Sequence, residues 1–249
     1  MTSENIIGLP FIELISVDST NNYAMGLIHA GMAQHGTVVF AHEQTKGKGQ
    51  RQKEWISSPG QNIMLSIIIR PFFLSIDKQF LLSMTVAIGV HTFFSKYAGD
   101  QTKIKWPNDL YWNDRKAGGI LIENQVQGHV WKHAVVGIGI NINQINFHPS
   151  AGNAVSLKQV TGREWNIIDA AKELVQHLNS ELTVLLDAPG DVRKRYHQAL
   201  YKWNEVQEFR INEKTFTAKV DGVTEEGYLV ATHNRKEYFK TGELEWIIT

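Results

Sequence analysis

The chain contains 249 residues, of which 43% are hydrophobic and 20% are charged, as is ordinary for a packed globular protein. Its 25 lysines and arginines balance its 25 aspartates and glutamates, which argues against the broadly basic surface of a general nucleic-acid binder. The chain has no cysteine, which excludes disulfides, zinc–thiolate sites and thiol nucleophiles.

The N-terminal residues carry no basic segment followed by a long apolar one, so no signal peptide is predicted. The longest apolar run, residues 63–69, has the length of a strand, whereas a membrane-spanning helix needs about 20 residues. We therefore expect a soluble, cytoplasmic protein that makes no contact with a membrane.

Apolar residues at helical spacing, and β-branched runs bounded by turn residues, predict helices and strands along the chain. In chain order these are a strand at residues 10–17, a helix at 21–33, strands at 37–42 and 62–70, a helix at 75–97, strands at 102–106, 110–112, 116–124 and 130–141, and helices at 167–186 and 192–203. Short alternating runs separated by glycines follow from residue 205 onward. The pattern predicts an α+β domain of residues 1–203 followed by a small β-barrel of residues 204–249.

Residues 44–61 have no helix or strand period, and their first part, residues 44–55, is called here the glycine-basic loop. It carries Lys46, Lys48, Arg51 and Lys53 against Glu54, four positive charges to one negative. Glycines let backbone N–H groups approach a ligand, and lysine and arginine bind phosphate or carboxylate oxygens. The loop is therefore either an anion-binding loop over a nucleotide or a mobile, solvated segment. Its glycine spacing matches neither a P-loop nor a dinucleotide-binding fingerprint.

A second feature is the segment Lys-Trp-Pro-Asn-Asp at residues 105–109. A lysine at the end of a buried strand is costly unless it meets an anion. Asn108 and Asp109 then add short polar groups that suit a nucleotide or a metal. The alternative is a Trp-Pro turn with a surface lysine and an ordinary Asx turn.

Two further segments have both a structural and a ligand-binding interpretation. Residues 18–21, Asp-Ser-Thr-Asn, either cap the helix that follows or hydrogen-bond a small ligand at its N-terminus. Residues 137–143 place glycines on one face of a strand, which leaves room for a flat group or for tight packing.

His129 and His133 lie about 13 Å apart on a predicted strand, so a metal pair is not expected there. The elbow motif of serine hydrolases does not occur in the sequence.

These features, in their order and spacing, resemble those of biotin protein ligases, the enzymes that attach biotin to carboxylase carrier domains. The similar segments are residues 19–21, 47–51 with Trp55, 57–60 with 62–66, 105–109, 115–116 with 118–123, and 137–143. They fall between residues 10 and 145, and the C-terminal β module is similar to the small SH3-like domain of that family.

The resemblance implies a fold and a reaction. Residues 1–203 would form a catalytic domain related to class II aminoacyl-tRNA synthetases, with a mixed central β-sheet and flanking helices, and residues 204–249 an SH3-like β-barrel. In the implied reaction, the biotin carboxylate attacks the α-phosphate of ATP to give biotinyl-5′-AMP and pyrophosphate. A lysine of the biotin carboxyl carrier domain of acetyl-CoA carboxylase or a related carboxylase then attacks the mixed anhydride and releases AMP.

The resemblance also assigns site residues. The catalytic residues would be Lys105 and Lys48, and the biotin-binding residues Ser19, Thr20, Asn21, Gln44, Lys48, Gly49, Gln50 and Lys105. The nucleotide-binding residues would be Gly47, Arg51, Trp55, Asn108 and Asn141. No fixed metal site is expected in the protein, and Mg²⁺ would arrive with ATP.

The glycine-basic loop departs from the family pattern, which commonly reads Gly-Arg-Gly-Arg-Arg-Gly. Lys48 and Gln50 replace two of the arginines, which keeps the charge at position 48 but loses bidentate geometry. Gln52 replaces the last glycine, which argues against a left-handed turn at that position. The first strand begins about ten residues after Met1, so we expect the short form, which lacks the DNA-binding module of some relatives and binds no DNA.

Other functions stay open on the sequence alone. A lipoate or octanoate ligase shares the catalytic fold. Residues 19–21, the glycine-basic loop and residues 105–109, called here the lysine segment, favour biotin as the substrate. The non-enzymatic alternatives are a biotinyl-adenylate sensor, against which the intact Lys105 counts, and a transcriptional regulator, against which the expected lack of DNA-binding residues counts. Both a monomer and a homodimer, formed by pairing of sheet edges, are compatible with the sequence.

Overall fold

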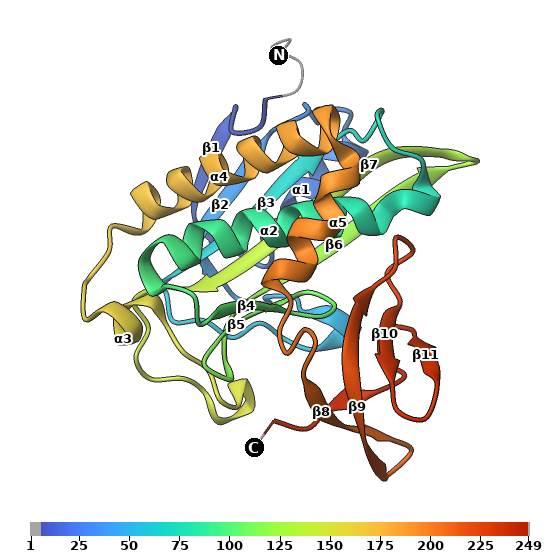
Figure 1. Ribbon diagram of the computed structural model, residues 1–249. Helices are drawn as coiled ribbons and strands as arrows, with labels where there is room; N and C mark the ends of the chain where they lie inside the picture. The colour runs from blue at the N-terminus through green and yellow to red at the C-terminus, as the bar shows by residue number, and fades with distance from the viewer. Residues whose placement is uncertain (1–5, 249) are drawn as a thin grey trace.

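Seven strands form a mixed sheet at the centre of the larger part of the protein, as the computed structural model shows for residues 6–248 (Figure 1). Their bounds are β1 (Phe11–Val17), β2 (Val38–Gln44), β3 (Asn62–Ile69), β4 (Thr102–Lys105), β5 (Asp109–Trp112), β6 (Arg115–Gln127) and β7 (Val130–Asn141). The order across the sheet is β1-β2-β3-β7-β6-β5-β4, in which β1 and β2 are parallel and the other neighbours are antiparallel. This confirms the predicted mixed central sheet.

Helices cover both faces of this sheet (Figure 1). Their bounds are α1 (Thr20–His29), α2 (Gln79–Ala98), α3 (Leu157–Thr161), α4 (Ile167–Asp187) and α5 (Pro189–Ala199). On one face, Ala24 and Ile28 of α1 form a small buried cluster with Ile68 of β3. Because successive strand residues point to opposite faces, Ile67 and Ile69 belong instead to the main core under α2 and α4.

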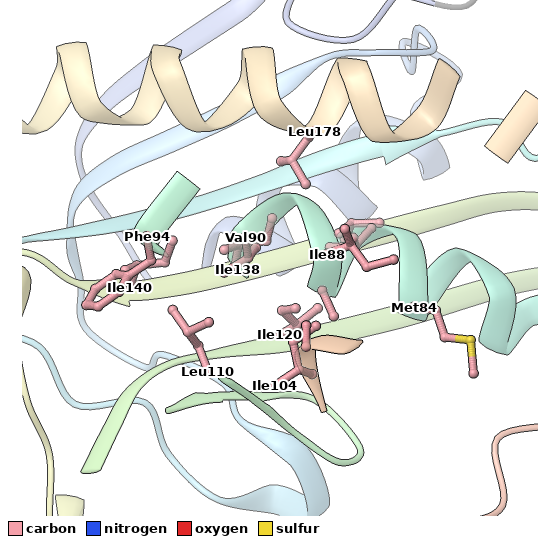
Figure 2. Packing of buried hydrophobic residues seen from close by; sticks show 14 of the residues in the cluster. Met84, Ile88, Val90, Phe94, Ile104, Leu110, Ile120, Ile138, Ile140 and Leu178 are labelled. Carbon is pink, nitrogen blue, oxygen red and sulfur yellow. The ribbon is translucent and has the colours of Figure 1, made fainter. Parts of the chain in front are cut away.

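The main core lies between α2, α4 and the sheet. Figure 2 shows Val90 and Phe94 of α2, Leu178 of α4, and Ile138 and Ile140 of β7 converging there. Strand β3 is buried along its whole length because helices cover both of its faces, which explains its nearly continuous apolar sequence.

A second, antiparallel sheet follows the helices and corresponds to the predicted C-terminal β module (Figure 1). Its strands are β8 (Val206–Ile211), β9 (Lys214–Val223), β10 (Leu229–Thr232), β11 (Lys236–Phe239) and β12 (Glu245–Trp246), in the order β11-β10-β9-β8-β12. Within residues 6–248, β11 and β12 are not paired with each other, so the strand pairing shows an open sheet. The indole N–H of Trp106, in the larger part, donates to the carbonyl of Gly227 at 3.0 Å and links the two parts through a buried hydrogen bond.

Three predicted helices differ from the observed ones at their ends. The helix predicted at 21–33 ends at His29, because Gly31 takes a left-handed conformation with φ +72°. The helix predicted at 192–203 begins earlier, at Pro189, whose fixed φ suits a first helical turn, and it ends at Ala199. The first residues of the helix predicted at 75–97 form a separate 3₁₀ turn, Ile76–Lys78. No helix within the described residues is both long enough and apolar enough to cross a membrane.

Candidate active site

A cleft of about 1000 Å³ lies where the central sheet, the glycine-basic loop and the C-terminal sheet meet. Its walls contain nearly all of the predicted site residues, namely Ser19, Thr20, Asn21, Gln44, Lys48, Gly49, Gln50, Arg51, Trp55, Lys105, Asn108 and Asn141. Gly47 packs behind the wall, where a Cβ atom would lie 2.3 Å from the Trp55 carbonyl oxygen. The fold therefore brings together segments that are far apart in the sequence.

A buried polar network lines one end of the cleft. Gln44 Oε1 accepts hydrogen bonds from the backbone N–H of Thr20 at 2.7 Å and from its hydroxyl at 3.0 Å. The Ser66 hydroxyl lies 2.7 Å from Thr20 Oγ1 and 2.6 Å from Asn21 Oδ1. Asn21 Nδ2 in turn donates to Glu123 Oε2 at 2.7 Å. These bonds hold hydroxyl, amide and carboxylate groups in fixed orientations beside the cleft.

The same end of the cleft contains residues 19–21, part of the segment for which two interpretations were open. Ser19 occupies the N-cap position of α1, but its side chain makes no capping hydrogen bond. Ser19, Thr20 and Asn21 are each at most 3% exposed, yet all three line the cleft. These residues form part of the cleft wall, and the side chains of Thr20 and Asn21 hydrogen-bond within the polar network.

The glycines of β7 make room for two side chains. A Cβ atom on Gly137 would lie 2.3 Å from Asn21 Oδ1, so the network requires a glycine there. A Cβ atom on Gly139 would lie 2.6 Å from the Trp55 indole. The flat group expected against this strand is therefore the indole of the glycine-basic loop itself.

The glycine-basic loop has an ordered, hairpin-like path. The Trp55 N–H donates to the Gly47 carbonyl at 2.9 Å, and the Gly49 N–H donates to the Lys53 carbonyl at 2.7 Å. Arg51 and Gln52 both have positive φ angles, +55° and +62°. The expectation that Gln52 would prevent a left-handed turn is therefore wrong, because the hydrogen bonds on either side hold the turn in place.

The loop is also anchored to the C-terminal sheet. The Arg51 guanidinium donates to the carbonyl of Thr241 at 2.6 Å and to that of Gly242 at 3.5 Å. A Cβ atom on Gly242, whose φ is +85°, would overlap the guanidinium, so only glycine leaves room for Arg51. Lys48, at the other side of the loop, lies 3.5 Å from Glu123 Oε1 and joins the loop to the polar network.

Lys105 ends β4 beside the cleft and has an unusual environment. Its ammonium lies 5.2 Å from the centre of the Tyr111 ring and 5.5 Å from that of Trp246. Burial lowers its pKa, and although Asp109 acts in the opposite direction, that carboxylate already pairs with Lys116 at 2.7 Å. No ion pair found among residues 6–248 involves Lys105. A partly buried ammonium without a carboxylate partner is suited to an anionic ligand.

Asn108 and Asn141 use their amide groups within the wall. Asn108 Nδ2 donates to the Ile120 carbonyl at 2.8 Å, and Asn141 Nδ2 donates to the Val155 carbonyl at 3.1 Å. These bonds tie neighbouring segments of the wall together and leave each side-chain carbonyl as a possible acceptor for a ligand or its metal ion.

Sequence reasoning missed several cleft or network residues, and four of them matter most here. Ser66 and Glu123 stand in segments that matched the family pattern, and Ser66 is the one polar residue of the apolar run 63–69. Lys116, which pairs with Asp109, lies in another matched segment. Trp246 belongs to the C-terminal sheet, and no local signal in the sequence links it to the cleft.

Comparison with known proteins finds one family model and several curated relatives that the chain matches. The model of the biotin/lipoate A/B protein ligase family matches residues 13–141. The bifunctional ligase/repressor BirA of Bacillus subtilis is 38% identical over 149 residues, which cover 59% of this chain and 44% of BirA. The biotin–[acetyl-CoA-carboxylase] ligase of Paracoccus denitrificans is 32% identical over 155 residues, covering 60% of this chain and 63% of that enzyme. The match thus spans about half the length of these curated relatives.

Solved structures share the fold of nearly the whole chain. The biotin protein ligase of Aquifex aeolicus in complex with biotin and ATP has a TM-score of 0.79 at 22% identity, covering 97% of this chain and 100% of that one. The enzyme of Leishmania major in complex with biotinyl-5-AMP has a TM-score of 0.67 at 20% identity, with 94% and 99% coverage. At this level of identity the likeness is one of fold, and it includes the C-terminal part.

Proposed function

Because the chain belongs to the biotin/lipoate A/B protein ligase family, we propose that it is a biotin protein ligase that forms biotinyl-5′-AMP from biotin and ATP. It then transfers biotin to a lysine of a biotin carboxyl carrier domain. The observation that carries this proposal is a partly buried ammonium without an ion-pair partner, Lys105, in the same cleft as a fixed network of hydroxyl and amide groups. The names of the relatives, which are biotin ligases, support biotin as the substrate.

The two parts of the chain take different roles in this proposal. Residues 1–203 form the catalytic domain, and residues 204–249 form a small domain of the SH3-like type, of which the antiparallel strands β8 to β12 are the observed elements. Both parts line the cleft, so the domains act together on one ligand.

The polar network forms the biotin subsite. The ureido ring of biotin offers one carbonyl acceptor and two N–H donors, which match the hydroxyls and amides of Ser19, Thr20, Asn21 and Gln44. Lys48, Gly49 and Gln50 of the loop close over the biotin carboxylate, where the Lys48 ammonium and backbone N–H groups stabilise negative charge.

The nucleotide binds along the rest of the cleft. Trp55 provides an aromatic face, while Gly47 and Arg51 order the loop around the phosphates. Asn108 and Asn141 present side-chain oxygens from the wall. Mg²⁺ is bound in nucleotide sites by one or two carboxylates together with phosphates, and Asp109 is a carboxylate on this wall that would meet it.

Catalysis follows from orientation and charge. A biotin carboxylate oxygen attacks the α-phosphorus of ATP, the bond to the bridging oxygen breaks, and pyrophosphate leaves. Lys105 and Lys48 stabilise the negative charge that develops on the α-phosphate oxygens. In the second step the neutral amine of the carrier lysine attacks the acyl carbon, the carbon–oxygen bond to AMP breaks, and the amine gives up a proton to solvent.

One experiment tests this function directly. A biotin carboxyl carrier domain is incubated with the protein, MgATP and either biotin or lipoate, and its mass is measured. We expect biotin to be added to one lysine and AMP and pyrophosphate to be released. Addition of lipoate instead would identify a lipoate ligase, and adenylate formation without transfer to a carrier would favour the sensor alternative.

A further inference from the structure

Trp246 lies on the last strand of the chain but reaches the lysine of the first domain. It belongs to β12, more than 140 positions after Lys105, and its indole lines the cleft. The Lys105 ammonium lies 5.5 Å from the centre of this indole and 5.2 Å from the centre of the Tyr111 ring. Two aromatic rings, one from each part of the molecule, therefore flank the same cation.

The Trp246 indole packs among aromatic neighbours. It is 9% exposed, and it packs edge-on against Phe209, its partner across the β8–β12 pair, at 4.8 Å between ring centres. It also packs against Tyr201 at 5.7 Å, and the Tyr201 hydroxyl donates to Asp114 Oδ1 at 2.5 Å. Tyr201 contacts Tyr111 in turn, at 5.6 Å, so the two rings beside Lys105 share one support.

The charged groups around Lys105 do not hold it in place. Asp109 from β5 is paired with Lys116 from β6, Lys53 from the loop repels the ammonium, and Glu245 from β12 pairs with Arg210 at 3.2 Å. A lysine side chain has four rotatable bonds, so an ammonium without a partner samples many positions. An aromatic face attracts a cation through its quadrupole without neutralising it, whereas a carboxylate would cancel the charge that the reaction needs.

We propose that Trp246 is a positioning residue for Lys105, whose ammonium its indole face and the Tyr111 ring hold in the cleft. This inference rests on the proposed function, in which Lys105 stabilises the charge that develops on the α-phosphate. The C-terminal sheet thereby contributes to the adenylation step through one aromatic face. The Trp246 Nε1–H has no hydrogen-bond partner among the described residues. The indole acts on the Lys105 ammonium through its ring face.

Two substitutions separate the ring face from apolar bulk. Trp246→Phe keeps an aromatic face, while Trp246→Leu keeps an apolar side chain without one. We expect Trp246→Leu to lower kcat for pyrophosphate release by about tenfold with little change in KM for biotin, and Trp246→Phe to retain most of the activity. Phe239→Leu is the matched control, because Phe239 is a buried aromatic residue of the same sheet that does not line the cleft.

The result that overturns the proposal is equally specific. Wild-type kcat in Trp246→Leu, or an equal loss in Trp246→Phe and Trp246→Leu, would show that the aromatic face does not position Lys105. If Trp246→Leu does not fold, the pair Tyr111→Phe and Tyr111→Leu makes the same comparison at the other ring.

A measurement without substrates distinguishes this inference from the proposed function. The lysines are labelled briefly with acetic anhydride, and the modification of Lys105 relative to Lys103 on the same strand is measured by mass spectrometry. We expect the Lys105:Lys103 ratio to rise several-fold in Trp246→Leu and to stay near the wild-type value in Trp246→Phe. An unchanged Lys105:Lys103 ratio in Trp246→Leu overturns the inference about Trp246, whatever the activity of the wild-type protein. Failure of the wild-type protein to form biotinyl-AMP would instead refute the proposed function, and the labelling ratio does not depend on that result.

Discussion

Lys105 illustrates how the role of one residue depends on the partners that its neighbours take. Asp109 stands directly across the β4–β5 pair from Lys105, and its negative charge acts to raise the pKa of Lys105. Lys116 takes that carboxylate instead, at 2.7 Å. Lys105 is thereby left as a partly buried cation whose pKa is lowered by burial, beside aromatic rings and open to an anionic ligand.

Substitution of this cation tests its catalytic role. We expect Lys105→Ala to lower the rate of biotin-dependent pyrophosphate release by about 100-fold or more, because the charge that develops on the α-phosphate loses a preorganised cation. The protein should stay folded, since no ion pair within residues 6–248 depends on Lys105. Lys103→Ala, on the same strand but outside the cleft lining, is the control. A wild-type rate in Lys105→Ala would remove Lys105 from the mechanism.

Gly137 offers a test of the polar network. In Gly137→Ala the new Cβ atom would lie 2.3 Å from Asn21 Oδ1, so Asn21 must move and lose its bonds to Ser66 and Glu123. We expect the KM for biotin to rise about tenfold, equivalent to about 1.4 kcal/mol of lost binding. Steady-state kinetics would measure this.

The control for this change is Gly26→Ala in α1. A Cβ atom added at Gly26 would meet no neighbouring atom within 4 Å, and alanine favours a helix more than glycine does by about 1 kcal/mol. We expect Gly26→Ala to leave the KM for biotin unchanged. An equal KM in wild type and Gly137→Ala would show that Asn21 does not contribute to biotin binding.

At the scale of the element, the glycine-basic loop combines order with strain. Hydrogen bonds within it and the contacts of Arg51 with Thr241 and Gly242 give it one path. Arg51 and Gln52 nevertheless occupy the left-handed region, which is unfavourable for residues other than glycine. A segment that is held mainly by polar contacts at the surface opens more easily than the sheet beneath it.

Hydrogen exchange measured by mass spectrometry can follow this loop. We expect backbone amides of residues 47–55 to exchange faster than those of β3 in the free protein, and to become protected when biotin and MgATP are added together. The reason is that the adenylate gives Lys48, Gly49 and Trp55 a ligand to close on. The exchange of α4, which lies away from the cleft, serves as the internal reference. Unchanged exchange over residues 47–55 would show that the loop does not close on ligand.

At the scale of the whole molecule, the two sheets are joined through residues that also serve the cleft. Trp106, from the lysine segment, donates to Gly227, and Arg51, from the loop, donates to Thr241. The relative position of the two parts therefore depends on the same segments that line the site.

The stability of the whole molecule should depend on pH through three partly buried histidines. Burial lowers the pKa of His91, His133 and His197 below the ordinary value of 6.5. The unfolded chain then binds more protons than the folded protein just below that pH, so the free energy of unfolding falls as the pH falls through and below 6.5. The contribution of these histidines to the free energy of unfolding is fully present above their ordinary pKa, where the imidazoles are neutral in both the folded and the unfolded state.

Urea unfolding of wild type and His91→Gln between pH 7.5 and 5 tests this dependence. His91 Nε2 contacts the Thr102 carbonyl at 3.1 Å, and glutamine can supply a donor to that carbonyl without a titrating group. We expect the fall in unfolding free energy with falling pH to be shallower in His91→Gln. Identical pH dependence in the two proteins would exclude His91 as a contributor.

The sequence alone determined the elements of the central sheet, the family and the short segments that contribute twelve predicted residues to the cleft wall. Strand β7 was predicted with its observed bounds, 130–141, because a buried strand between turn signals carries its own boundaries. The site segments could be found because each is a short, contiguous motif whose residue types reflect local chemistry. The prediction that argued against a left-handed turn at Gln52 was wrong, because hydrogen bonds that the residue type does not indicate hold the turn in place.

Only the tertiary structure decided which of these residues touch and which charges stay unpaired. Glu123 joins Asn21 to Lys48, Lys116 takes Asp109 away from Lys105, and Trp246 reaches Lys105 from the far end of the chain. Such pairings depend on how sheets and helices pack, and residues separated by tens to hundreds of positions leave no local pattern. Burial and partner choice, which set the pKa of Lys105, exist only once the chain has folded.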